Sequence, residues 1–92
     1  MNFYVIAYDI PNDRRRQKIA DLLEGYGKRV QYSVFECYLS RSKLKELQTK
    51  LLKTFKLEED SIRFYFLSSS SLHQVQVWGN PGLTAPPSST II

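Results

Sequence analysis

The stretch FYVIAYD, Phe3–Asp9, decides the fold that we expect for this chain. It is a short run of aromatic and β-branched residues that stops before Ile10 and Pro11, and these features favour a β-strand over a helix. Because apolar side chains occur at both odd and even positions, we expect this strand to be central in a sheet and covered on both faces. Asp9 then stands at the carboxyl end of a buried strand.

The rest of the chain alternates between helical and strand patterns. Apolar residues at helical spacing predict one helix capped by Asn12 or Asp13 and a second capped by Ser40 or Ser42. Lys28–Leu39 is too long for one ordinary strand, so we expect two short strands with a bend or bulge near residues 32–33. Further strands are predicted over Ser61–Leu67 and Leu72–Trp78.

This order predicts an α+β fold, a ferredoxin-like βαββαβ sandwich with an added C-terminal strand. Both helices of that plan lie on one face of the sheet. Since the first strand is apolar on both sides, we expect a second copy to cover the other face in a sheet-to-sheet homodimer. Residues 1–79 would form the domain, and residues 80–92 a tail rich in Pro, Gly, Ser and Thr. The apolar end of the tail, Ile91-Ile92, could dock on the partner protomer.

The composition limits the partners. The 92 residues suffice for one domain, and 13 Lys and Arg against 9 Asp and Glu give a net charge of +4, which suits an anionic partner. A single cysteine and a single histidine argue against an internal disulfide and against a zinc site of soft ligands. Neither a signal-peptide pattern nor a membrane-spanning apolar stretch is present, so we expect a cytoplasmic protein without a membrane partner.

Asp9 is the sharpest candidate for chemistry. A carboxylate at the end of a central apolar strand is costly to bury unless it is paired, hydrogen-bonded or bound to a metal. Two copies that meet in a dimer could share a hard cation such as Mg²⁺, which activates water and polarises phosphoryl oxygens. The alternative is that Asp9 accepts backbone N–H bonds in the turn through Pro11.

Basic and aromatic residues supply a second set of candidates. Phosphate contacts are predicted for residues at the start of the first helix and of the second strand, while a solvated basic face remains the alternative. These residues are Arg14, Arg15, Arg16, Lys18, Lys28 and Arg29. Tyr8, Tyr32 and Phe35 can stack on bases or belong to a core or interface. Ser33 can assist the metal or the phosphate. No Walker, GxGxxG or HExxH motif is present.

Three segments taken together resemble one known family. The strand YVIAYDI, the DRRR that opens the first helix, and the block YGKRVQYSVFEC resemble the CRISPR-associated Cas-two family, the small partner in spacer acquisition. The match runs in order over about residues 3–39. The later DSIRFYFL and the spacing Val75, Val77 and Gly79 extend it to about residue 79.

The resemblance implies a ferredoxin-like homodimer that works with the Cas-one integrase and holds protospacer DNA. It implies that the C-terminal strand packs against the neighbouring protomer. Some relatives are Mg²⁺-dependent endoribonucleases on single-stranded RNA, and others cleave double-stranded DNA. By that similarity Asp9 would bind the metal and be catalytic together with Tyr8, Ser33 and Phe35. Arg16, Lys18 and Arg29 match positions linked to activity or binding.

Two functional hypotheses therefore stay open, a Mg²⁺-dependent nuclease and a non-catalytic DNA-binding scaffold dimer. They use the same residues, so the sequence does not separate them. An acyl-phosphate hydrolase of similar fold is rejected, because Tyr32 replaces a glycine that its phosphate cradle needs. A domain that binds a regulatory small molecule is a weaker alternative.

Overall fold

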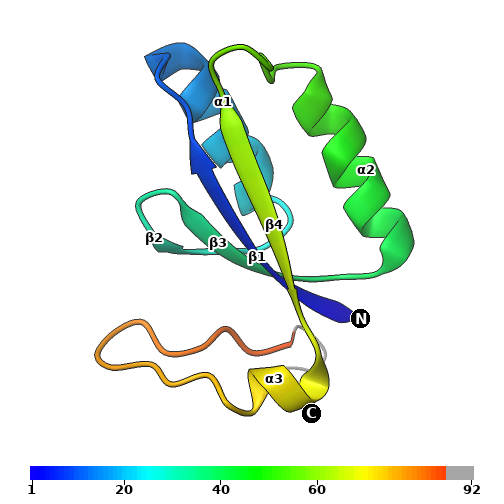
Figure 1. Ribbon diagram of the computed structural model, residues 1–92, viewed down its shortest axis with the longest axis vertical. Coiled ribbons are helices and arrows are strands. Elements are labelled where there is room, and N and C mark those ends of the chain that lie inside the picture. The colour runs from blue at the N-terminus through cyan, green and yellow to red at the C-terminus, as the bar shows by residue number, and fades with distance from the viewer. Residues whose placement is uncertain (87–92) are drawn as a thin grey trace.

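The computed structural model describes residues 1–86 and contains a single four-stranded sheet in that range (Figure 1). The sheet has the order β2-β3-β1-β4, and each pair of neighbouring strands is antiparallel. The elements are β1 (Asn2–Asp9), α1 (Asp13–Glu24), β2 (Lys28–Gln31), β3 (Val34–Leu39), α2 (Arg41–Leu52), β4 (Ser61–Leu67) and α3 (Ser69–Leu72). This is the ferredoxin-like βαββαβ plan, with β1 inside the sheet as predicted.

Side-chain caps set the starts of the two long helices. The Asn12 side chain accepts a hydrogen bond from the backbone N–H of Arg15 at 2.9 Å, and the Ser40 hydroxyl accepts one from that of Lys43 at 3.2 Å. Each bond satisfies a first-turn donor that has no partner inside its helix. Of the two alternatives given for each cap, Asn12 and Ser40 are therefore correct.

The segment Lys28–Leu39 is divided into two strands as predicted. A tight turn at residues 32–33 joins β2 to β3. The pairing register shifts between Arg29 and Gln31, so the irregularity falls slightly earlier than the expected bend. Such a bulge increases the local twist and changes the direction of nearby side chains.

Both long helices cover the same face of the sheet. Ile6 of β1 lies opposite Phe35 of β3, and the two side chains share one buried cluster with Ile19 of α1 and Leu47 of α2. Residues of alternating strand positions point to opposite faces, so Tyr8 also faces the helices. The core thus lies between the sheet and one helical layer.

The opposite face of the sheet, here called the open face, carries Val5, Ala7, Arg63 and Tyr65 by the same alternation. The C-terminal segment reaches this face. The Thr84 backbone N–H and hydroxyl both donate to the Glu36 carboxylate, at 3.0 and 2.7 Å. Whether a second copy covers the open face stays a prediction.

The strand predicted over Leu72–Trp78 is wrong for the single chain. Residues 69–72 form α3, capped by the Ser68 hydroxyl, and the chain continues without strand pairing through Trp78. Alternation alone does not provide a sheet edge to pair with, and the serine run favours a helical turn instead. The predicted docking of Ile91-Ile92 lies outside the described residues. Within residues 1–86, no helix has the length and apolar character that crossing a membrane requires.

Candidate functional site

Asp9 occupies the exposed end of β1. Its strand register places it opposite Ser61, and a shallow hollow of about 150 Å³ is lined by Ala7, Tyr8, Asp9, Ser61 and Arg63. Within residues 1–86, no group donates a hydrogen bond to the Asp9 carboxylate, so the alternative of backbone bonds in the turn is not what the structure shows. The carboxylate is therefore free to accept a ligand.

A hydrogen-bonded cluster ties this end of β1 to the turn between β2 and β3. The Tyr8 backbone N–H donates to the Ser33 carbonyl at 3.1 Å, and the Tyr8 hydroxyl donates to the Tyr32 carbonyl at 3.4 Å. The Arg29 guanidinium in turn donates to the Tyr8 hydroxyl at 3.2 Å. Tyr8 thereby fixes both the turn and the position of Arg29.

The structure buries two of the residues predicted to be catalytic, and it corrects a direct contact for Phe35. The Phe35 side chain is 0% exposed, and Tyr8 is buried as well. Their rings lie 6.3 Å apart in a stacked arrangement inside the core. The Phe35 ring cannot touch a substrate from this position, whereas Tyr8 also lines the Asp9 hollow. The catalytic role of Tyr8 stays a prediction. Ser33 is half-buried, and its hydroxyl role stays a prediction.

The three arginines at the start of α1 have different environments. Arg14 is exposed, whereas Arg15 forms a two-bond ion pair with Asp60 at 2.9 Å and a further one with Glu59. The Asp60 side chain is 0% exposed, and the hydrogen bonds from Arg15 lower its pKa despite the opposing effect of desolvation. Arg15 is thus committed to a structural partner, which corrects its prediction as a phosphate ligand.

Arg16 supports the loop before α1. Its guanidinium donates to the Ile10 carbonyl at 2.9 Å and pairs with Asp13. The hydrogen bond to Asp13 is the main cause of the raised pKa of Arg16, and the Tyr32 hydroxyl contributes in the same direction. Arg16 therefore lies between the loop after β1 and the turn after β2.

The remaining predicted phosphate ligands are accessible. Lys18 is exposed on α1, and Lys28 and Arg29 are exposed at the start of β2. With Arg14, they make four cations of the predicted set that have no ion-pair partner among the described residues. An anionic polymer can neutralise such cations and release counterions.

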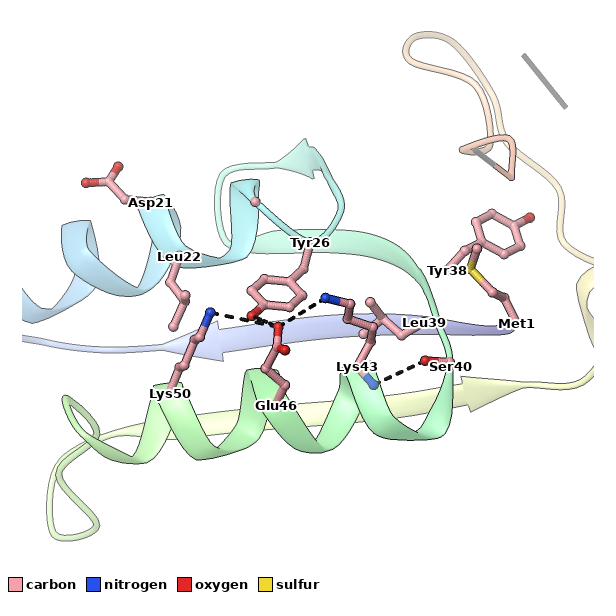
Figure 2. Close-up of a pocket in the computed structure, with 11 residues that line it drawn as sticks. Met1, Asp21, Leu22, Tyr26, Tyr38, Leu39, Ser40, Lys43, Glu46 and Lys50 are labelled. Carbon is pink, nitrogen blue, oxygen red and sulfur yellow. Dashed lines mark hydrogen bonds and ion pairs between the residues drawn. The ribbon is translucent and has the colours of Figure 1, made fainter. Parts of the chain in front are cut away.

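A hollow larger than the one at Asp9 lies elsewhere on the molecule, and none of the predicted site residues lines it. It has a volume of about 620 Å³ and lies beside Tyr26 and α2 (Figure 2). The Tyr26 hydroxyl donates to the Glu46 carboxylate, and Lys43 and Lys50 approach it at 3.5 and 3.8 Å. The hydrogen bond from Tyr26 is the main cause that lowers the pKa of Glu46, and the positive charges of the two lysines lower it further. The Glu46 carboxylate is therefore already fully engaged by side chains of this network.

Known proteins resemble this chain over its whole length. The family described as CRISPR associated protein Cas2 matches residues 1–75. The chain belongs to the Cas2 family. A relative from Synechocystis named "CRISPR-associated endoribonuclease Cas2 3" is 66% identical, and the alignment covers all of both chains.

Solved structures of Cas2 proteins share the fold. Cas2 of Streptococcus pyogenes superposes with a TM-score of 0.73 at 30% identity, covering 84% of this chain and 99% of that one. A chain of a structure titled "Partial Cas6-RT-Cas1--Cas2 complex" superposes with a TM-score of 0.75 at 36% identity, covering 84% and 90%. The Cas2 resemblance read from the sequence is confirmed.

Two residues of this Cas2-family chain were missed as parts of the site. Arg63 lines the Asp9 hollow because β4 pairs with β1 in a register that puts Arg63 opposite Ala7. Asp60 holds Arg15 across 45 positions of sequence. Neither could be found from spacing, because both contacts depend on how β4 is placed.

Proposed function

We propose that this chain is a CRISPR adaptation component that binds nucleic acid in the cytoplasm as a homodimer together with the Cas1 integrase. We propose further that it is an endoribonuclease on single-stranded RNA. The nearly full-length likeness to a chain of a Cas1–Cas2 complex supports the partnership. The name of the Synechocystis relative, which matches over every residue, supports the nuclease activity.

The observation that carries the nuclease proposal is the free Asp9 carboxylate. It is exposed at a strand end, beside a hollow that Arg63 also lines. One or two carboxylates plus several waters are the usual ligands of Mg²⁺. Within residues 1–86, no group of three or more His, Cys, Asp and Glu side chains could hold a metal. The donor set therefore fits Mg²⁺ best when two copies of the chain each supply Asp9.

The chain's own side chains would have separate tasks. When bound, Mg²⁺ would lower the pKa of a coordinated water and polarise a phosphoryl oxygen. Arg14, Lys18 and Lys28 are exposed and would hold phosphates of the nucleic acid. Arg29, oriented by the Tyr8 hydroxyl, would hold a phosphate near the turn between β2 and β3.

The test is cleavage of a labelled, unstructured RNA by the purified dimer with Mg²⁺ and with EDTA. We expect Asp9→Asn to reduce the rate by on the order of 100-fold or more, since metal stabilisation of developing charge amounts to several kcal/mol. Asp21→Asn is the matched control, because Asp21 is an exposed carboxylate on α1 that bonds only Gln17 among the described residues. Wild-type cleavage by Asp9→Asn, or cleavage that persists in EDTA, would contradict the proposal.

The second candidate is a scaffold dimer that binds DNA without cleaving it. This candidate is favoured by the small number of carboxylates at the strand end: among the described residues, Asp9 is the one carboxylate that lines the hollow there. Duplex binding measured at several salt concentrations separates the two, because the slope reports phosphate contacts. A scaffold would give a steep slope that Asp9→Asn leaves unchanged, and the wild-type protein would not cleave any substrate.

A further inference from the structure

Tyr32 differs from the other aromatic residues of the site. It stands at the tip of the turn between β2 and β3, and its side chain is 72% exposed. Phe35, three residues later, is fully buried. A singly exposed ring is common on protein surfaces, so it is the setting of Tyr32, on an anchored turn beside Arg29, that distinguishes it.

The turn that carries Tyr32 is held in place from below. The Tyr32 carbonyl accepts a hydrogen bond from the Tyr8 hydroxyl at 3.4 Å, and the Ser33 carbonyl accepts one from the Tyr8 backbone N–H at 3.1 Å. Tyr8 itself is buried against the core. The backbone of the turn is therefore anchored while its ring projects outward, an arrangement that reduces the entropy cost of binding.

A guanidinium supports one side of this ring. The Arg29 Cζ lies 5.8 Å from the Tyr32 ring centroid and 5.4 Å from that of Phe35, within the range of cation–π attraction. Arg29 also donates to the Tyr8 hydroxyl at 3.2 Å. Phe35, Arg29 and Tyr32 thus form a continuous series of contacts from the core to the surface, which leaves most of the Tyr32 ring accessible.

Basic residues lie near the turn that carries the ring. The Tyr32 hydroxyl is close enough to Arg16 to affect its pKa, and Lys28 is exposed on the same strand as Arg29. Arg16 already pairs with Asp13, whereas Arg29 has no ion-pair partner among residues 1–86, so a purely apolar partner would leave the Arg29 charge without a counter-ion. A ligand that presents a flat π face beside negative charge satisfies both the ring and the cations, and an unpaired nucleotide has this chemistry.

We propose that Tyr32 is a stacking platform for an unpaired base of single-stranded nucleic acid, with Arg29 placed for the adjoining phosphate. The inference rests on the proposed function in that it assigns the same ligand class. It adds that the site recognises unstacked bases, and so discriminates single strands from duplexes, in which the base faces are already stacked.

The test compares ligands that differ only in their bases. Binding of a short oligoadenylate RNA, of an abasic ribose-phosphate chain of equal length, and of the corresponding duplex is measured by fluorescence polarisation in EDTA, where no cleavage proceeds. The variants are Tyr32→Leu, which removes the ring and keeps bulk, and Tyr32→Trp, which keeps a ring. Tyr26→Leu is the matched control, since Tyr26 also lies beside a cation, with Lys50 Nζ 5.3 Å from its ring centroid.

We expect Tyr32→Leu to weaken oligoadenylate binding by about 5- to 150-fold, the range for one stacked base, and to leave the abasic chain unaffected. Tyr32→Trp should bind as the wild type does, and Tyr26→Leu should be unchanged. Equal losses for oligoadenylate and the abasic chain would overturn the proposal, because the ring would then act only through its arginines. Unchanged oligoadenylate binding by Tyr32→Leu, or a wild type that binds both ligands equally, would overturn it as well.

The outcome is separable from that of the proposed activity. If the wild type fails to cleave RNA but shows Tyr32-dependent binding of bases, the nuclease proposal fails and the stacking site stands. If Asp9-dependent cleavage is present and Tyr32→Leu binds oligoadenylate normally, the stacking site fails alone.

Discussion

Gly27, which leads into β2, provides a sharp test of how closely β2 packs against β3. A Cβ atom added at this position would lie 2.2 Å from the Cys37 Sγ and 2.5 Å from the Glu36 carbonyl oxygen. The Glu36 carbonyl oxygen belongs to the backbone, so it cannot rotate away as the end of a flexible side chain can. Gly27→Ala therefore requires β2 and β3 to separate locally, next to the strand that carries Arg29 and the turn that carries Tyr32.

The magnitude follows from two opposing effects. Overpacking of this kind costs about 1–3 kcal/mol of unfolding free energy. Replacing glycine by alanine where the backbone is compatible stabilises by about 0.4–1 kcal/mol through the unfolded chain. Gly25 is the matched control, because its φ is −76° and its added Cβ would lie 3.4 Å from the Leu22 carbonyl oxygen. We expect Gly25→Ala to be neutral or stabilising. Because the effect on the unfolded chain is common to both variants, Gly27→Ala should be less stable than Gly25→Ala by the overpacking cost, about 1–3 kcal/mol.

Urea unfolding of both variants at equal protein concentration measures the difference. A further variant, Gly27→Ala with Cys37→Ala, removes the sulfur contact but leaves the Glu36 carbonyl, so we expect the two substitutions to be coupled and the rescue to be partial. Equal stability of Gly27→Ala and Gly25→Ala would refute the close approach of the two strands. Full rescue by the double variant would show that the backbone contact is not limiting.

Two predictions concern buried groups. Asp60→Asn should lower the unfolding midpoint at neutral pH. Because Arg15 lowers the pKa of Asp60 in the folded protein, the ion pair stabilises fully above the unfolded pKa of about 3.9. This stabilisation is lost as the pH falls through the lower, folded pKa. Unfolding measured from pH 7 to pH 3 should therefore show the gap between wild type and Asp60→Asn narrowing in acid, and a gap that widens would contradict the ion pair. Burial raises the pKa of the Cys37 thiol to about 11, so alkylation by iodoacetamide at pH 8 should be slow in the native protein and fast in denaturant. Rapid native labelling would show that this part of the core opens readily.

Much of the fold was accessible from local sequence chemistry. The aromatic and β-branched run ending at Pro11 predicts β1, and Asn12 and Ser40 predict the helix starts, because a strand pattern and a cap depend on neighbouring residues. The same reasoning failed at Leu72–Trp78. There the alternation was correct as a pattern, but a strand requires an edge to pair with, and the single chain pairs none with this segment.

The sequence by itself determined which residues can act: an acidic strand end at Asp9, a basic helix start and an aromatic block with serine. The tertiary structure decided which of them are available. Arg15 is bound to Asp60 and Arg14 is exposed, while Phe35 is buried and Tyr32 is exposed. The physical reason is that residue type and spacing are local properties, whereas burial and ion pairing depend on strand register and on contacts between residues far apart in the chain.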